Sequence, residues 1–124
     1  MRYVSTRGRA SELGFCDALL AGLATDGGLY VPQTWPSQPK AVGATYSEKA
    51  ASLMAPYVEG EIPQDVFAQL CKTAYSTFRD PAVVPLVQIA PEHYLLELFH
   101  GPLLAFKDFA LQWIGKLFDY VLKI

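Results

Sequence analysis

Residues 106–122 read FKDFALQWIGKLFDYVL, and apolar side chains recur there at helical spacing on two sides of one predicted helix. One stripe consists of Phe106, Phe109, Trp113, Leu117 and Tyr120, and the other of Leu111, Ile114, Phe118, Val121 and Leu122. A helix that is apolar around most of its circumference is typically buried. We therefore expect other parts of the protein to cover this helix on both sides.

The apolar pattern still continues where the chain reaches Lys123 and Ile124, and no capping Gly, Asn or Pro follows. We therefore expect the chain to be the N-terminal part of a longer protein, whose remainder covers the second stripe. Without that cover the stripe would form an apolar patch, which favours a homo-oligomer through the exposed C-terminal helix.

Working back from this helix, two short apolar runs at 83–90 and 94–99 are rich in Val, Ile, Leu and Tyr and predict strands. A third helix is predicted from Pro63 to the Asp80-Pro81 stop. A second helix starts where Thr45 and Glu48 stand at capping-box spacing, and it is expected to end over residues 56–60.

Nearer the amino terminus, a first helix is predicted from Ser11 to Gly22, between short strands at 3–4 and 29–31. Residues 32–43, rich in Pro, Gln, Ser and Thr, predict a loop. The fold class is therefore α+β. We expect a small domain of three helices packed on a few short strands, with the last helix projecting or pairing with another copy.

The composition limits the classes of function that the chain can have. A chain of 124 residues with 52% hydrophobic residues can form one domain with a real core, and a net charge of −2 without Lys/Arg clusters argues against nucleic-acid binding. The sequence contains no apolar run that could span a bilayer, and its start lacks the apolar stretch of a signal peptide, so we expect no membrane and a cytoplasmic protein. Cys16 and Cys71 are far apart, which favours neither a zinc site nor a disulfide framework.

Lys107 is the main candidate for chemistry, because it follows a Gly-Pro turn, begins the last helix and lies between Phe106 and Phe109. A lysine that forms a Schiff base must be partly neutral, and desolvation by these rings would favour that state. The alternative is an ordinary solvated lysine beside Asp108. Neither His93 nor His100 has a partner at a diagnostic spacing.

Three stretches carry a resemblance to a known family. They are ELFHGPLLAFKDFALQ (97–112), YVSTRG (3–8) and LLAGLA with DGGLYVP (19–24 and 26–32), and they come from both ends of the chain. The first is similar to the cofactor-lysine segment of the threonine synthase family, and the other two resemble amino-terminal segments of that family in the same order.

This resemblance implies a pyridoxal 5'-phosphate (PLP) enzyme that converts O-phospho-L-homoserine and water to L-threonine and phosphate. It makes Lys107 the catalytic and cofactor-binding lysine, with no metal. It also implies an N-terminal domain over 1–92, followed at 93–124 by the start, with its first helix, of a tryptophan-synthase-β-like PLP domain. Residues 1–124 alone are expected to be inactive and to bind PLP weakly or not at all.

Two alternatives remain open from the sequence. The chain could be a binding or regulatory module that kept this scaffold without the chemistry, although retention of Lys107 argues against it. It could also belong to a related PLP lyase with another amino-acid substrate.

Overall fold

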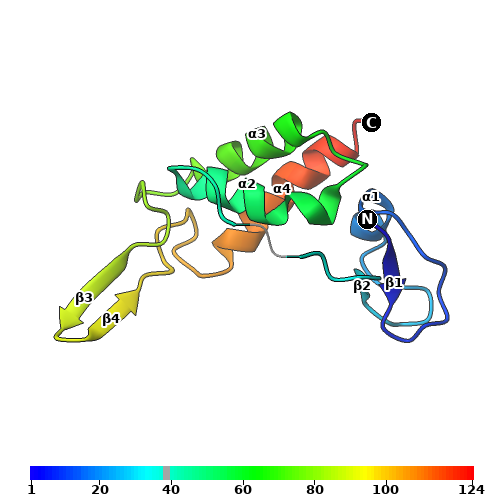
Figure 1. Ribbon diagram of the computed structural model, residues 1–124, viewed down its shortest axis with the longest axis horizontal. Coiled ribbons are helices and arrows are strands. Elements are labelled where there is room, and N and C mark those ends of the chain that lie inside the picture. Colours follow the sequence, from blue (N-terminus) through cyan, green and yellow to red (C-terminus); the bar gives the residue numbers. More distant parts are fainter. Residues whose placement is uncertain (38–39) are drawn as a thin grey trace.

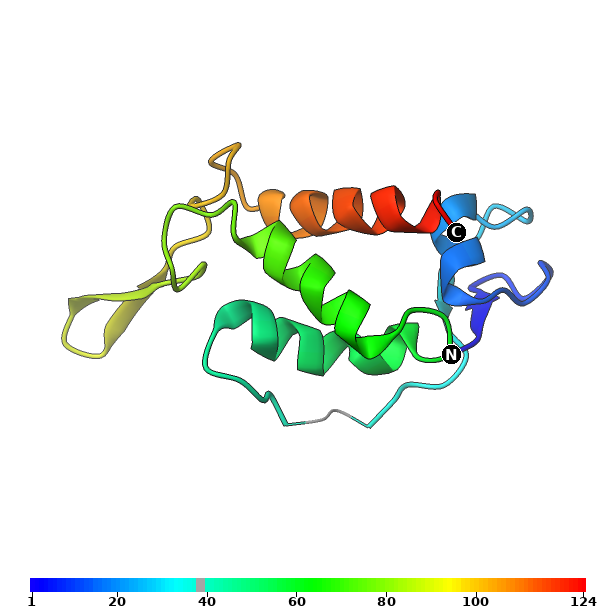
Figure 2. The same cartoon turned by 90° about the horizontal axis from the view of Figure 1, so that it is seen from above.

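The protein is elongated, with three helices in the middle and a small strand-containing unit at each end (Figures 1 and 2). The computed structural model describes residues 1–37 and 40–124. The predicted loop over 32–43 includes residues 38 and 39, which lie outside the described residues.

The amino-terminal unit consists of strand β1 (Tyr3–Ser5), helix α1 (Phe15–Ala21) and strand β2 (Tyr30–Pro32). The two strands pair antiparallel, with Val4 opposite Val31. The helix predicted from Ser11 begins later, because Leu13 is held in a bridge with Tyr3. Gly22 ends the helix as expected, in a positive-φ conformation that favours glycine (φ 68°).

Helix α2 (Tyr46–Val58) starts with the predicted capping box, in which Thr45 and Glu48 each accept a hydrogen bond from the other's backbone N–H. Pro56 was expected to end this helix but lies inside it. The missing proline N–H affects only the last turn, and that turn is held by the buried side chain of Val58.

Helix α3 (Gln64–Tyr75) follows Pro63 as predicted and ends before the predicted Asp80-Pro81 stop. Helix α4 (Asp108–Val121) packs against α3, which in turn packs against α2. The core lies between these three helices, and its buried members are Ala51, Val58, Ile62, Phe67, Cys71, Tyr75, Phe78, Val83 and Leu117.

The α+β class is therefore confirmed, but the expected packing of helices on strands is wrong. Strands β1 and β2 are only three residues long and pair with each other at one end of the molecule. Strands β3 (Leu86–Ala90) and β4 (His93–Leu96) form an antiparallel hairpin that projects from the other end (Figure 1). Strands this short offer the helices too little apolar surface, so the helices bury their faces against one another.

The hairpin is shorter than the runs that predicted it, and every residue of both strands is exposed. Val83, placed in the first run, instead takes a positive φ of 63° and joins the helical core. Exposed apolar residues on both faces of a hairpin are typical of a surface that another part of a protein contacts.

Helix α4 does not project as expected: its main buried face packs against α3, and Asp108 in its first turn is buried beside the preceding loop. Leu117 is fully buried and Trp113 packs edge-on against Phe67, whereas Leu111 on the second stripe is 49% exposed. Phe106, expected on the first stripe, precedes the helix and is 65% exposed. Among the described residues, no helix is long and apolar enough to cross a membrane.

Candidate active site

Lys107 stands at the N-cap of α4 with helical backbone angles (φ −61°, ψ −21°). Its carbonyl oxygen accepts hydrogen bonds from the backbone N–H groups of Ala110 (3.2 Å) and Leu111 (2.9 Å). The backbone of Lys107 is thus fixed in the helix while its side chain is exposed. The sequence placed this lysine correctly at the start of the helix.

The expected aromatic shielding of Lys107 is not present among the described residues. Phe106 is largely exposed, and Phe109 turns into the core, where its ring centroid lies 5.0 Å from that of Phe78 and 6.4 Å from that of Tyr46. The two phenylalanines therefore diverge, and neither covers the amine in this part of the chain.

Asp108, next to Lys107, is fully buried. One carboxylate oxygen accepts a hydrogen bond from the backbone N–H of Leu103 (2.8 Å), and the other accepts one from the side-chain amide of Gln112 (3.1 Å). A Cβ at Gly101 would collide with the Asp108 side chain, so glycine is required there for this close approach. The sequence analysis considered Asp108 only as a neighbour of the lysine and missed its burial.

The loop before Lys107 is held at its other end by His100. The His100 carbonyl accepts a hydrogen bond from the backbone N–H of Arg79 (2.8 Å), and its ring stacks on Phe99. Its Nε2 lies 2.6 Å from a carboxylate oxygen of Glu97, a partner that the sequence analysis did not single out. The i,i+3 spacing gave no signal because the segment is not helical.

His93 begins β4 directly after the hairpin turn, and its Nδ1 is 3.0 Å from the carbonyl oxygen of Pro91 in that turn. This contact agrees with a turn role. Among the described residues, no group of three or more His, Cys, Asp or Glu side chains could hold a metal ion.

A second polar cluster joins the segments 3–8 and 26–32. Asp26 accepts hydrogen bonds from the Ser5 hydroxyl (2.7 Å) and from the backbone N–H groups of Gly28, Arg9 and Ala10. These bonds, the Ser5 bond foremost, lower the pKa of Asp26 to about 2. The polar groups of this cluster hydrogen-bond to one another, and these bonds link β1 to the turn before β2.

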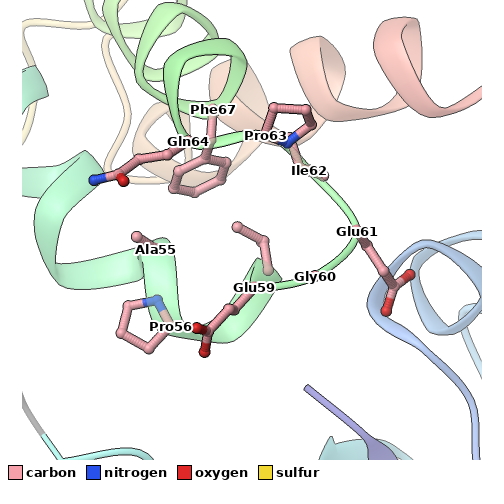
Figure 3. A pocket seen from close by; sticks show the side chains of 10 residues that line it. Ala55, Pro56, Glu59, Gly60, Glu61, Ile62, Pro63, Gln64 and Phe67 are labelled. Atoms are coloured by element: carbon pink, nitrogen blue, oxygen red, sulfur yellow. The ribbon is translucent and has the colours of Figure 1, made fainter.

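A cavity of about 560 Å³ opens beside the connection between α2 and α3 (Figure 3). Phe67 and Pro56 line it, while Glu61 points away toward α1, where its carboxylate accepts hydrogen bonds from the backbone N–H groups of Phe15 (2.6 Å) and Cys16 (2.9 Å). The cavity lies at the opposite end of the helical body from the start of α4 (Figure 2). It is therefore separate from the Lys107 loop.

The two cysteines are free, and neither is prepared to react. Cys71 is fully buried in the core, and partial burial together with the Glu61 carboxylate raises the pKa of Cys16 to about 11. A thiol with a raised pKa is protonated at neutral pH. Lys107 thus remains the main chemical candidate.

Comparison with known proteins identifies the family. A family model described as the threonine synthase N terminus matches residues 2–75. The chain is 50% identical to a threonine synthase of Pseudomonas aeruginosa and 42% identical to that of Schizosaccharomyces pombe, over 98% and 97% of its length.

Solved structures agree in fold over nearly the whole chain. A PLP-bound threonine synthase from Brucella melitensis matches with a TM-score of 0.91 and 53% identity over 99% of this chain, and yeast threonine synthase matches with a TM-score of 0.88 and 42% identity over 98%. The chain spans about a quarter of the length of these relatives, 24–28% of each. Because the family model covers more than half of the chain, the chain belongs to the threonine synthase family and carries that family's N-terminal region.

Proposed function

We propose that this chain forms part of a PLP-dependent threonine synthase, which converts O-phospho-L-homoserine and water to L-threonine and phosphate. The observation that carries the proposal is the position of Lys107, an exposed amine on a rigid helix start, in a chain that superimposes on a PLP-bound threonine synthase. Within this enzyme Lys107 is the catalytic and cofactor-binding residue.

The described residues fit part of a PLP site. An exposed primary amine can bond covalently to the aldehyde carbon of PLP, and Lys107 presents one on a fixed backbone. When bound, PLP stabilises the negative charge that develops on the substrate carbon beside the amino group. Lys107 Nζ first holds the cofactor and, once the substrate amine has displaced it, moves a proton to or from the substrate.

The described residues after Lys107 contain no glycine-rich loop of the kind that cradles a phosphate group. The rest of the site is then supplied by chain outside residues 1–124. For this reason we propose that residues 1–124 alone are inactive and hold PLP weakly or not at all.

The domain division follows from the same proposal. We assign 1–92 to an N-terminal domain and 93–124 to the start of a catalytic domain of the tryptophan-synthase-β type. The family model of the N terminus ends at residue 75, before this boundary, and the boundary itself falls in the turn between β3 and β4.

Location and assembly are also proposals. Two free cysteines are typical of a reducing compartment, which supports a cytoplasmic enzyme. Exposed apolar residues, among them Leu111 on α4 and Leu122 directly after it, support self-association of residues 1–124 through this helix.

Turnover on the longest chain that the gene encodes tests the function. We expect phosphate release from O-phospho-L-homoserine and no comparable reaction with L-serine or L-threonine. Lys107→Ala should lower kcat by about 10²–10⁴-fold, the usual contribution of a general acid-base group, whereas Lys116→Ala on the same helix should leave it unchanged. Turnover of serine or threonine in place of the phosphorylated substrate would identify another PLP lyase.

A further inference from the structure

Asp108 is the one fully buried charged side chain among the described residues, and the chemistry proposed for Lys107 does not use it. Burial of a carboxylate is costly unless hydrogen bonds compensate for the lost water. Both oxygens of Asp108 are compensated, one by a loop N–H and one by a side-chain amide. Because its burial is costly and it lies next to the main candidate lysine, we expect Asp108 to have a structural role.

The hydrogen bonds of Asp108 join the loop before Lys107 to helix α4. They reach back five residues to Leu103 in the loop and forward one helical turn to Gln112. The loop is further closed by the hydrogen bond from the Leu104 N–H to the Gly101 carbonyl (3.1 Å), with Leu104 at a positive φ of 57°. A non-glycine residue in that conformation is strained and must be held by its surroundings.

The direction of Lys107 depends on that of Asp108. Successive helical residues point about 100° apart, so holding the Asp108 side chain against the 101–104 loop also fixes the direction in which Lys107 points. The observed exposures, a buried Asp108 beside an exposed Lys107, agree with this geometry. If the loop came away from Asp108, the first turn of α4 would fray and Lys107 would lose its fixed direction.

We propose that Asp108 is a positioning residue, which orients Lys107 by binding the 101–104 loop to the first turn of α4. This inference rests on the proposed role of Lys107 as the cofactor lysine. Asp108 itself does not contact the reacting atoms, and what it contributes is the hydrogen bonds to Leu103 and Gln112.

The test measures where PLP attaches. The longest chain that the gene encodes is incubated with PLP, reduced with borohydride and mapped by peptide mass analysis. The readout is the ratio of labelling at Lys107 to labelling at Lys49, an exposed lysine on α2. Thermal unfolding and circular dichroism of each variant report folding separately, so a lower ratio supports the inference only in a variant that remains folded.

Asp108→Ala should lower the Lys107 to Lys49 ratio by at least about tenfold, as expected for loss of hydrogen bonds to a buried charged group. Asp108→Asn should keep the ratio within about threefold, since its amide oxygen still accepts from Leu103 and Gln112 can turn its own amide to match. Asp119→Ala, which removes an exposed acid from the same helix, should leave the ratio unchanged.

Three results would overturn the inference. The first is an unchanged ratio in folded Asp108→Ala, and the second is an equal loss in Asp108→Asn. If Asp108→Ala does not fold, Gln112→Ala is used instead, because it removes one donor from Asp108 and should lower the Lys107 to Lys49 ratio. An unchanged ratio in Gln112→Ala is the third result. Absence of Lys107 labelling in the unsubstituted chain would instead overturn the proposed function, and this inference with it.

Discussion

Asp26 is the residue that organises the amino-terminal unit. Its carboxylate accepts from the Ser5 hydroxyl and from three backbone N–H groups, and a Cβ at Gly28 would collide with the Ser5 side chain. The segments 3–8 and 26–32 are thus fitted closely to each other.

The lowered pKa of Asp26 predicts a pH dependence of stability. The pKa is 3.8 ordinarily and about 2 in the folded chain, so the ionised form stabilises the fold above pH 3.8 and this contribution is lost as the pH falls through that interval. Urea unfolding between pH 5 and pH 2 should show a steeper loss in the chain than in Asp26→Asn.

Asp119→Asn serves as the control for that experiment, because Asp119 is exposed and, within the described structure, contacts only Lys116 in an exposed ion pair. Its unfolding curve should keep the pH slope of the unsubstituted chain. Equal slopes for the chain and for Asp26→Asn would contradict the account of Asp26.

At this scale the sequence predicted some positions well and others badly. Lys107 was placed correctly because a Gly-Pro turn followed by an apolar repeat marks a helix start. The burial of Asp108 could not be predicted, because it depends on a bond to Leu103 in a loop whose path has no periodic signal. The same applies to the Glu97–His100 contact.

Among the helices and strands, α4 shows most clearly that packing gives one apolar helix a buried side and an exposed side. Leu117 is fully buried against α3, whereas Leu111 faces outward and is half-exposed. The two leucines lie on the same helix and differ only in what they contact, which makes them a matched pair.

Leu117→Ala should lower the free energy of unfolding by about 2–5 kcal/mol, because it leaves a cavity in the core. Leu111→Ala should lower it by less than about 1 kcal/mol. Urea unfolding of residues 1–124 measures both. Similar losses for the two variants would mean that α4 does not pack in the way described.

The sequence predicted which helices and strands exist, but it did not predict how they pack. The capping box at Thr45 and Glu48 is a local signal and was confirmed, as was the helix after Pro63. The packing of helices on strands was wrong, because a short apolar strand has the same pattern whether it lies in a core or in an exposed hairpin. The pattern of apolar residues along β3 and β4 does not show which surface covers these strands.

At the scale of the whole molecule, Glu61 joins the amino-terminal unit to the helical body. It extends from the α2–α3 connection and its carboxylate accepts from the first N–H groups of α1, which otherwise lack partners (Figure 3). The Tyr3 hydroxyl adds a second link by donating to the Tyr57 carbonyl (2.6 Å).

Glu61→Ala should therefore increase amide hydrogen exchange at Phe15 and Cys16 by about tenfold or more, the effect of losing a hydrogen bond to a charged group. Exchange in the core helix α3 should not change. Glu59→Ala is the matched control, because the exposed Glu59 side chain makes no hydrogen bond in the described structure. If both variants gave the same exchange pattern, Glu61 would not be the link.

The hairpin and the outer face of α4 carry uncovered apolar side chains, and the solved relatives are more than three times as long as the part that this chain matches. Chemistry at Lys107 is therefore best tested in the longest chain that the gene encodes.

The most direct measurement is borohydride trapping of PLP on that chain, followed by peptide mapping, with Lys107→Ala as the control. A label on Lys107 that disappears in the variant is the predicted result and would establish the cofactor lysine. A well-folded chain that carries no label at Lys107 would contradict the account, and would indicate a binding module that has kept the scaffold without its chemistry.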